Sequence, residues 1–95
     1  MAVAVDLEFD GGTLAQYDEV ARLMHFEPGG AAPPGCLFHW GALTDHGLRV
    51  TDVWESKEQY EQYAQEKIGP LTQQAGIPGP PRITFYDVHN YQVRA

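Results

Sequence analysis

The sequence has little of several features that would assign a chain to a class of proteins at once. Cys36 is the single cysteine in 95 residues, so no internal disulfide can form, and no Cys/His spacing typical of a structural zinc site is present. We expect Cys36 to be a small buried residue. Six lysines and arginines stand against thirteen acidic residues and form no cluster, which argues against a nucleic-acid or anionic-membrane partner.

Long apolar runs are also missing. No stretch approaches the roughly 20 residues that a membrane-spanning helix requires. The first ten residues, MAVAVDLEFD, lack the basic segment and apolar core of a signal peptide, so we expect a cytoplasmic protein. What the sequence does contain is 43% hydrophobic residues in a length that suits one domain, which we place at residues 1–95.

Hydrophobic periodicity predicts six elements in the order β-α-β-β-α-β. Residues 2–9 alternate apolar and polar side chains and predict a strand; further strands are expected over 36–43, 48–55 and 82–91. Apolar residues at helical spacing predict helices over 14–27 and 57–75, capped by Thr13 and Ser56. Gly69-Pro70 should kink or split the second helix, and Gly76 should end it. This order predicts a ferredoxin-like α+β domain, with an antiparallel sheet and both helices on one face.

The predicted sheet is apolar on both faces. In the strand over 36–43 both alternating sets of side chains are apolar, and the last strand has Ile83 and Phe85 on one side with Tyr86 and Val88 on the other. A sheet that is apolar on both faces needs cover on both. Because the helices cover one face, the sequence predicts a homodimer in which a second copy covers the other.

Several stretches resemble the dimeric α+β-barrel superfamily, which includes antibiotic biosynthesis monooxygenases and small polyketide cyclases. They are VTDVWESKEQYEQYA at residues 50–64, FHW in the second strand and YDVHNY near the end. The resemblance implies a pocket between the sheet and the helices, and chemistry on a hydrophobic aromatic or polyketide-like molecule without a cofactor or metal. The monooxygenases of this group pair a first-strand asparagine with a tryptophan and a histidine. Trp54 matches that tryptophan, whereas the first strand offers only Asp6. Haem-degrading relatives use an axial histidine, for which His25 is the one candidate; we expect it to be a surface residue.

His39 and Asp52 are the leading candidates for catalysis, because a carboxylate that orients an imidazole makes a general base. They lie opposite each other if the hairpin connection has an even number of residues. A three-residue loop over 45–47 with a glycine bulge would instead pair His39 with Val53 and send Asp52 to the other face, with both tryptophans. Gly47 favours the bulge, so the two registers stay open.

Other residues complete the candidate site. His89 is the alternative base, in a last strand whose inward-facing set of side chains the sequence leaves open. Trp54 would supply a flat apolar wall for an aromatic ligand. Further substrate contacts are expected from large side chains that are also ordinary core material. They are Tyr17, Met24, Trp40, Tyr60 and Tyr63.

Two classes of function fit these residues. The first is a cofactor-independent enzyme in which His39 abstracts a proton and Asp52 orients it, leading to cyclisation, isomerisation or oxygenation of an electron-rich phenol. The second is a non-catalytic homodimeric binding or assembly module, in which the histidines make only structural hydrogen bonds. A cavity of a few hundred Å³ between sheet and helices would favour a small-ligand site.

Overall fold

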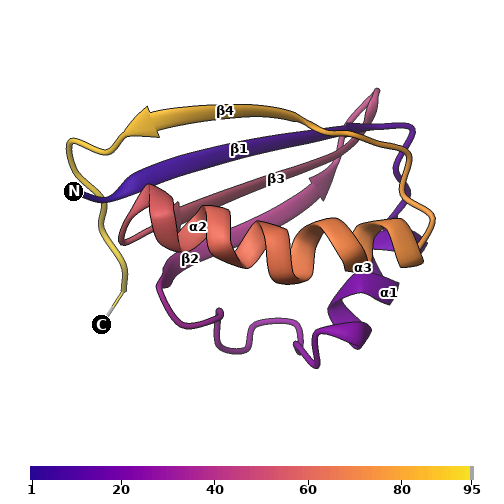
Figure 1. Cartoon of the computed structure of the whole chain (residues 1–95), viewed down its shortest axis with the longest axis horizontal. Coiled ribbons are helices and arrows are strands. Elements are labelled where there is room, and N and C mark those ends of the chain that lie inside the picture. Colours follow the sequence, from indigo (N-terminus) through magenta and orange to yellow (C-terminus); the bar gives the residue numbers. More distant parts are fainter. Residues whose placement is uncertain (95) are drawn as a thin grey trace.

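The computed structural model describes residues 1–94, which form one four-stranded sheet with all helices on one side (Figure 1). The strands lie in the order β2-β3-β1-β4, and every neighbouring pair is antiparallel. The predicted ferredoxin-like order is therefore confirmed. The strands are β1 (Val3–Asp10), β2 (Cys36–Leu43), β3 (Gly47–Trp54) and β4 (Arg82–Asp87). The helical segments are α1 (Leu14–Leu23), α2 (Lys57–Tyr63), the π-helical turn η1 (Ala64–Ile68) and α3 (Gly69–Gln74).

The helices begin and end largely as their capping residues predict. The Thr13 side chain accepts the amide hydrogen of Gln16, and the Gln16 side chain accepts that of Thr13, which is a complete capping box. Ser56 caps α2 through the amide of Gln59. Gly76, with φ of 80°, closes α3. Gln16 also donates to the Gly76 carbonyl at 2.8 Å, which joins α1 to the end of α3.

The second helix is interrupted next to Gly69-Pro70, as the sequence predicted, but the chain stays helical there. The amide of Gly69 bonds to the carbonyl of Ala64, five residues back, so that η1 is a wide turn. Pro70, which has no amide to donate, then lies in the first turn of α3, where no such donor is required.

Two predicted boundaries are wrong by more than one residue. The first helix ends at Leu23 and not at residue 27, because His25 adopts the left-handed conformation at φ of 61°. The amides of His25 and Phe26 then close the helix on carbonyls of its last turn, a role that glycine usually fills. The last strand ends at Asp87 and not at residue 91. Its partner β1 begins at Val3, so the ladder has no second strand beyond that point.

The hydrophobic core lies between the sheet and the helices. Asp52, 5% exposed, is the one buried charged residue among residues 1–94. The core side chains come chiefly from the inward-facing sets of β1 and β3: Val3, Val5, Leu7, Phe9, Leu48, Val50 and Trp54, with Tyr60 and Ile77 from the helical side. The helices therefore cover the inner face of the central strands β1 and β3 and leave the edge strands β2 and β4 more exposed.

The opposite face of the sheet, here called the open face, has no helical cover. Phe38 and Trp40 on β2 and Tyr86 on β4 belong to it and are 49%, 40% and 57% exposed. Towards the other end of the strands the open face carries charge, where Arg49, Glu8 and Arg82 lie in one row and Arg82 pairs with Glu8 at 3.4 Å. The expectation that both faces carry apolar side chains is confirmed, and the homodimer stays a prediction.

Candidate functional site

The β2–β3 hairpin has an even connection, which decides the register. Thr44 and Gly47 exchange backbone hydrogen bonds in both directions, and His39 lies directly opposite Asp52. The bulge that Gly47 favoured is therefore absent from the turn. Gly47 instead meets the backbone at the end of β1 and in the β1–α1 connection so closely that a Cβ there would collide with the Phe9 carbonyl oxygen and the Gly11 amide. The glycine is required by this close approach, at φ of 147°, rather than by a bulge.

A bulge does occur at the other end of β2, at Leu37. It makes Cys36 the residue opposite Trp54, where an uninterrupted ladder would place Leu37. The Cys36 thiol is half-buried and donates to the Phe38 carbonyl oxygen. Burial, reinforced by the charge of Asp52, raises the pKa of this thiol to about 12. A thiolate nucleophile at Cys36 is accordingly disfavoured.

His39 and Asp52 stand at the centre of a row of four side chains joined by hydrogen bonds. His39 Nδ1 lies 2.6 Å from Asp52 Oδ1, and Trp54 Nε1 donates to Asp52 Oδ2 at 3.1 Å. On the other side of the imidazole, the Tyr17 hydroxyl lies 2.6 Å from His39 Nε2. Tyr17, His39, Asp52 and Trp54 are called the hydrogen-bonded row below.

The row runs from the core to the surface. Trp54 is 1% exposed and Asp52 5%, whereas the His39 side chain is 36% exposed. Both oxygens of the buried Asp52 carboxylate face a donor, which is the condition for burying such a group. Because a carboxylate only accepts, the network assigns a hydrogen to His39 Nδ1. In neutral His39 the outward Nε2 is then an acceptor, and the Tyr17 hydroxyl donates to it.

Tyr17 reaches His39 from α1 because β2 has a glycine beneath it. A Cβ at Gly41 would lie only 2.6 Å from the Tyr17 ring, so the ring lies directly against the strand backbone. Burial raises the pKa of the Tyr17 hydroxyl, and the charges of Asp52 and Asp18 raise it further. The neutral phenol that donates to His39 is therefore favoured.

Aromatic rings from α2 hold Trp54 in place. The ring centroids of Tyr60 and Tyr63 lie 6.0 Å and 5.2 Å from that of Trp54, and the Tyr63 hydroxyl contacts Met24 Sδ at 3.3 Å. Burial, with the nearby charge of Asp52, raises the pKa of both tyrosines to about 12. Four predicted substrate contacts thus lie together here, packed against one another.

Other candidates lie away from the hydrogen-bonded row. Trp40 pairs with Thr51 and belongs to the open face, on the side of the sheet opposite His39. His89 follows the end of β4 and is exposed. Asp6, which stands where the resemblance would place an asparagine, also lies on the open face and binds Arg49. The structure therefore brings none of the three to His39.

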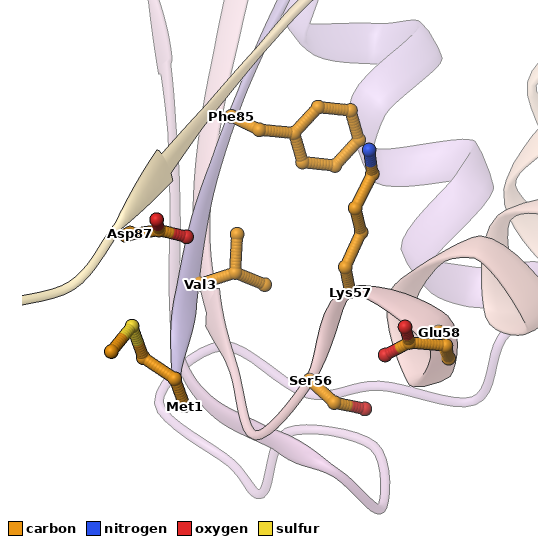
Figure 2. Close-up of a pocket in the computed structure, with 7 residues that line it drawn as sticks. All are labelled: Met1, Val3, Ser56, Lys57, Glu58, Phe85 and Asp87. Carbon is orange, nitrogen blue, oxygen red and sulfur yellow. The ribbon is translucent and has the colours of Figure 1, made fainter.

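A pocket of about 380 Å³ lies between the ends of β1 and β4 and the start of α2 (Figure 2). The Lys57 side chain extends towards the Phe85 ring, with Nζ 4.5 Å from the ring centroid. Tyr60 packs edge-on against Phe85 at 5.7 Å, so aromatic rings link the pocket to Trp54. Its lining residues are Met1, Val3, Ser56, Lys57, Glu58, Phe85 and Asp87.

The pocket is large enough for a small ligand, but neither His39 nor Asp52 lines it. Lys57 and Phe85 escaped the sequence interpretation because they meet only through the pairing of β4 with β1. The contact of the Tyr17 hydroxyl with His39 was also missed, although the sequence contains a signal for it. A glycine inside a strand, here Gly41, marks a place where another group approaches closely.

Side chains that could hold a metal ion do not cluster within residues 1–94. No three histidine, cysteine, aspartate or glutamate side chains in this range gather as a metal-binding group. His25 is exposed in the turn that closes α1. In the same range, no helix has the length and apolar character needed to cross a membrane.

Comparison with known proteins finds similar structures and no similar sequence. No protein-family model matches the chain, and no curated protein does. A protein of Chloroflexus aurantiacus assigned as an antibiotic biosynthesis monooxygenase superposes with a TM-score of 0.61 at 17% identity, covering 99% of this chain and 100% of that one. The ActVA-Orf6 monooxygenase of Streptomyces coelicolor, in complex with Nanaomycin D, gives 0.57 at 21%, covering 99% and 92%. A Deinococcus radiodurans protein of the same assignment gives 0.54 at 14%, covering 100% and 99%. The likeness spans the whole chain and establishes a shared fold.

Proposed function

We propose that this chain, which has the ferredoxin-like fold of the antibiotic biosynthesis monooxygenases, is a small cofactor-independent enzyme acting on a hydrophobic aromatic or polyketide-like molecule. The observation that carries the proposal is the contact of His39 with the buried Asp52 at 2.6 Å. The reaction begins with abstraction of a proton from the substrate. The resulting anion then cyclises or isomerises, or it is oxygenated by dioxygen.

The hydrogen-bonded row suits His39 to the role of general base. When the imidazole takes up a proton at Nε2, positive charge develops next to the Asp52 carboxylate, which stabilises it. The Trp54 N–H occupies the second oxygen of Asp52, so the carboxylate cannot easily turn away. Trp54, 1% exposed, therefore acts by holding Asp52 rather than as an open wall for the ligand.

Exposed apolar side chains on β2 and α1 support a hydrophobic substrate at the β2 edge. Leu43 belongs to the same set of β2 side chains as His39 and is 54% exposed. Leu14 lies one helical turn before Tyr17 on α1 and is 51% exposed. These leucines would contact a molecule long enough to reach from His39 along β2 and α1.

The experiment compares His39→Ala and His89→Ala with the wild-type protein on a panel of aromatic polyketide substrates, with and without oxygen. General-base catalysis contributes about 10²–10⁴-fold, so His39→Ala should lose that much turnover. His46→Ala, in the exposed hairpin turn, is the matched control. A loss confined to His89→Ala would move the role to His89, and full turnover in His39→Ala would refute the proposal. Dependence on oxygen separates oxygenation from cyclisation.

The pocket at Lys57 and Phe85 favours a second candidate function, small-molecule binding without catalysis. A cavity of about 380 Å³ that His39 does not line could hold a ligand that never meets the base. In that case Phe85→Ala would abolish binding of a ligand measured by calorimetry, whereas His39→Ala would leave it unchanged. The reverse result would favour the enzyme.

The open face supports a homodimer. Phe38 and Tyr86 lie in one row near one end of the strands with Trp40 in the next row, whereas Arg49, Glu8 and Arg82 form a charged row towards the other end. A two-fold axis parallel to the strands would place the apolar end of one copy on that of the other, with β2 facing β4 of the partner. An axis across the strands would press apolar on charged groups, which costs desolvation. We therefore expect the parallel axis.

A further inference from the structure

The atom through which His39 would act as a base is already occupied. With a hydrogen on Nδ1, the imidazole can accept a proton only at Nε2, and the Tyr17 hydroxyl lies 2.6 Å from that atom. The two rings are close to parallel, at 12°, with centroids 6.1 Å apart. A substrate could reach Nε2 directly only after Tyr17 had moved away.

The position of the Tyr17 ring depends on a glycine in the neighbouring strand β2. Gly41 leaves room for the ring, because a Cβ there would lie 2.6 Å, 2.8 Å and 3.0 Å from Cε2, Cζ and Oη of Tyr17. Any larger side chain at this place would push the hydroxyl away from His39. The half-buried ring thus has a dedicated space on the exposed side of the imidazole.

We propose that Tyr17 exchanges the proton with the substrate and that His39 is the base behind it. This proposal rests on the proposed function, and it changes which side chain meets the substrate. Tyr17 Oη takes the substrate's proton while its own proton passes to His39 Nε2. One bond of the substrate to hydrogen and the old Oη–H bond break, and a new Oη–H bond and an Nε2–H bond form. The substrate is left as an anion, and His39 becomes an imidazolium beside the Asp52 carboxylate.

This relay avoids a free tyrosine anion, which the site disfavours. Burial and the charges of Asp52 and Asp18 raise the pKa of Tyr17, so loss of its proton to water is unfavourable. In the relay the hydroxyl gains a proton as it gives one up, and Tyr17 ends neutral. The net charge separation is between the substrate anion and the imidazolium, which Asp52 stabilises.

The test follows exchange of the ring hydrogens of naphthoresorcinol, an electron-rich aromatic diol, for deuterium by NMR in heavy water. The wild-type protein should accelerate the exchange, and Tyr17→Phe should lower the enzyme-catalysed rate by about 10²–10⁴-fold, the usual contribution of a proton-transfer group. Tyr91→Phe, in the exposed segment after β4, removes a hydroxyl of the same kind and should have no effect. Circular dichroism and thermal unfolding confirm that each variant is folded.

A second variant separates a relay from a packing role. Gly41→Ala keeps the Tyr17 hydroxyl but displaces the ring, so it should lower the rate as Tyr17→Phe does. The double variant should be no slower than either single one, because both changes remove the same contact. In the wild type, rates in mixtures of light and heavy water should curve with deuterium content, as two protons move together.

The outcomes distinguish the two proposals. If His39 met the substrate directly, Tyr17→Phe would uncover Nε2, and the rate would hold or rise while His39→Ala stayed inactive. That result would overturn the relay and leave the general base in place. If the wild-type protein did not accelerate exchange, or if His39→Ala exchanged as fast as wild type, the proposed function would fail and the relay with it.

Discussion

Replacing Asp52 with asparagine changes the charge and the hydrogen-bonding capacity at the centre of the hydrogen-bonded row, but it almost preserves the shape of the side chain. Asp52 accepts from His39 Nδ1 at 2.6 Å and from Trp54 Nε1 at 3.1 Å. An asparagine side chain has one acceptor oxygen and one donor amide, so it cannot accept from both. Either the Trp54 N–H loses its acceptor, or His39 turns to the tautomer with its hydrogen on Nε2.

Each alternative has a calculable cost. A buried donor without a partner costs about 1–3 kcal/mol. The tautomer change replaces a hydrogen bond to a charged group, worth about 1.5–3 kcal/mol, by a neutral one worth about 0.5–1.5 kcal/mol. Asp52→Asn should therefore lower the free energy of unfolding by about 1–3 kcal/mol. In a domain of this size each kcal/mol lowers Tm by roughly 4–8 °C.

Denaturant unfolding followed by tryptophan fluorescence measures this change. A Trp40→Phe background leaves the buried Trp54 as the single reporter. Asp45→Asn, the same substitution in the exposed turn, is the control and should stay within about 0.5 kcal/mol of the parent. If Asp52→Asn unfolded at the same denaturant concentration as the parent, the carboxylate would not be holding both partners, and the argument from the row would be refuted.

Three further predictions concern the hairpin, the open face and alkaline stability. Gly47→Ala should destabilise the fold by more than about 2 kcal/mol in denaturant unfolding, because its Cβ would collide with the backbone of the β1–α1 connection. An unchanged free energy of unfolding would contradict the close approach. Trp40→Glu should convert the proposed dimer into a folded monomer, measured by light scattering at micromolar concentration; a monomeric wild type would refute the proposed dimer. Burial raises the pKa of Tyr60 and Tyr63 to about 12, so the unfolded chain releases these protons first. The urea concentration at the unfolding midpoint should be highest below about pH 10 and fall between about pH 10 and 12. A midpoint that does not change over this pH range would contradict the burial of the two tyrosines.

The order of elements and their caps could be predicted because they depend on neighbouring residues. The alternation in β1 and the capping box at Thr13 are local signals, and both are confirmed. The end of α1 was missed because a histidine, His25, takes the left-handed position that glycine usually marks. The end of β4 depends on where β1 begins, and a local pattern does not carry that information.

The candidate site was only half predictable for a similar reason. His39 and Asp52 were identified as a pair, but their meeting depended on a turn in which Gly47 had two possible explanations. The one that holds, close approach to the β1–α1 connection, involves residues far away in the sequence. Tyr17 was expected on the inner side of α1, yet its partner at His39 follows from how α1 packs on β2, which periodicity does not reveal.

The most direct test of the account is the tautomer of His39, read from long-range proton–nitrogen correlation NMR. The His39 signals are identified among the four histidines by their loss in His39→Gln. We predict that the hydrogen is on Nδ1, held by Asp52, and that Nε2 is the acceptor. In Asp52→Asn the hydrogen should be found on Nε2, or on both nitrogens in exchange. A wild-type imidazole with its hydrogen on Nε2 would contradict the claim that Asp52 prepares His39 to accept a proton.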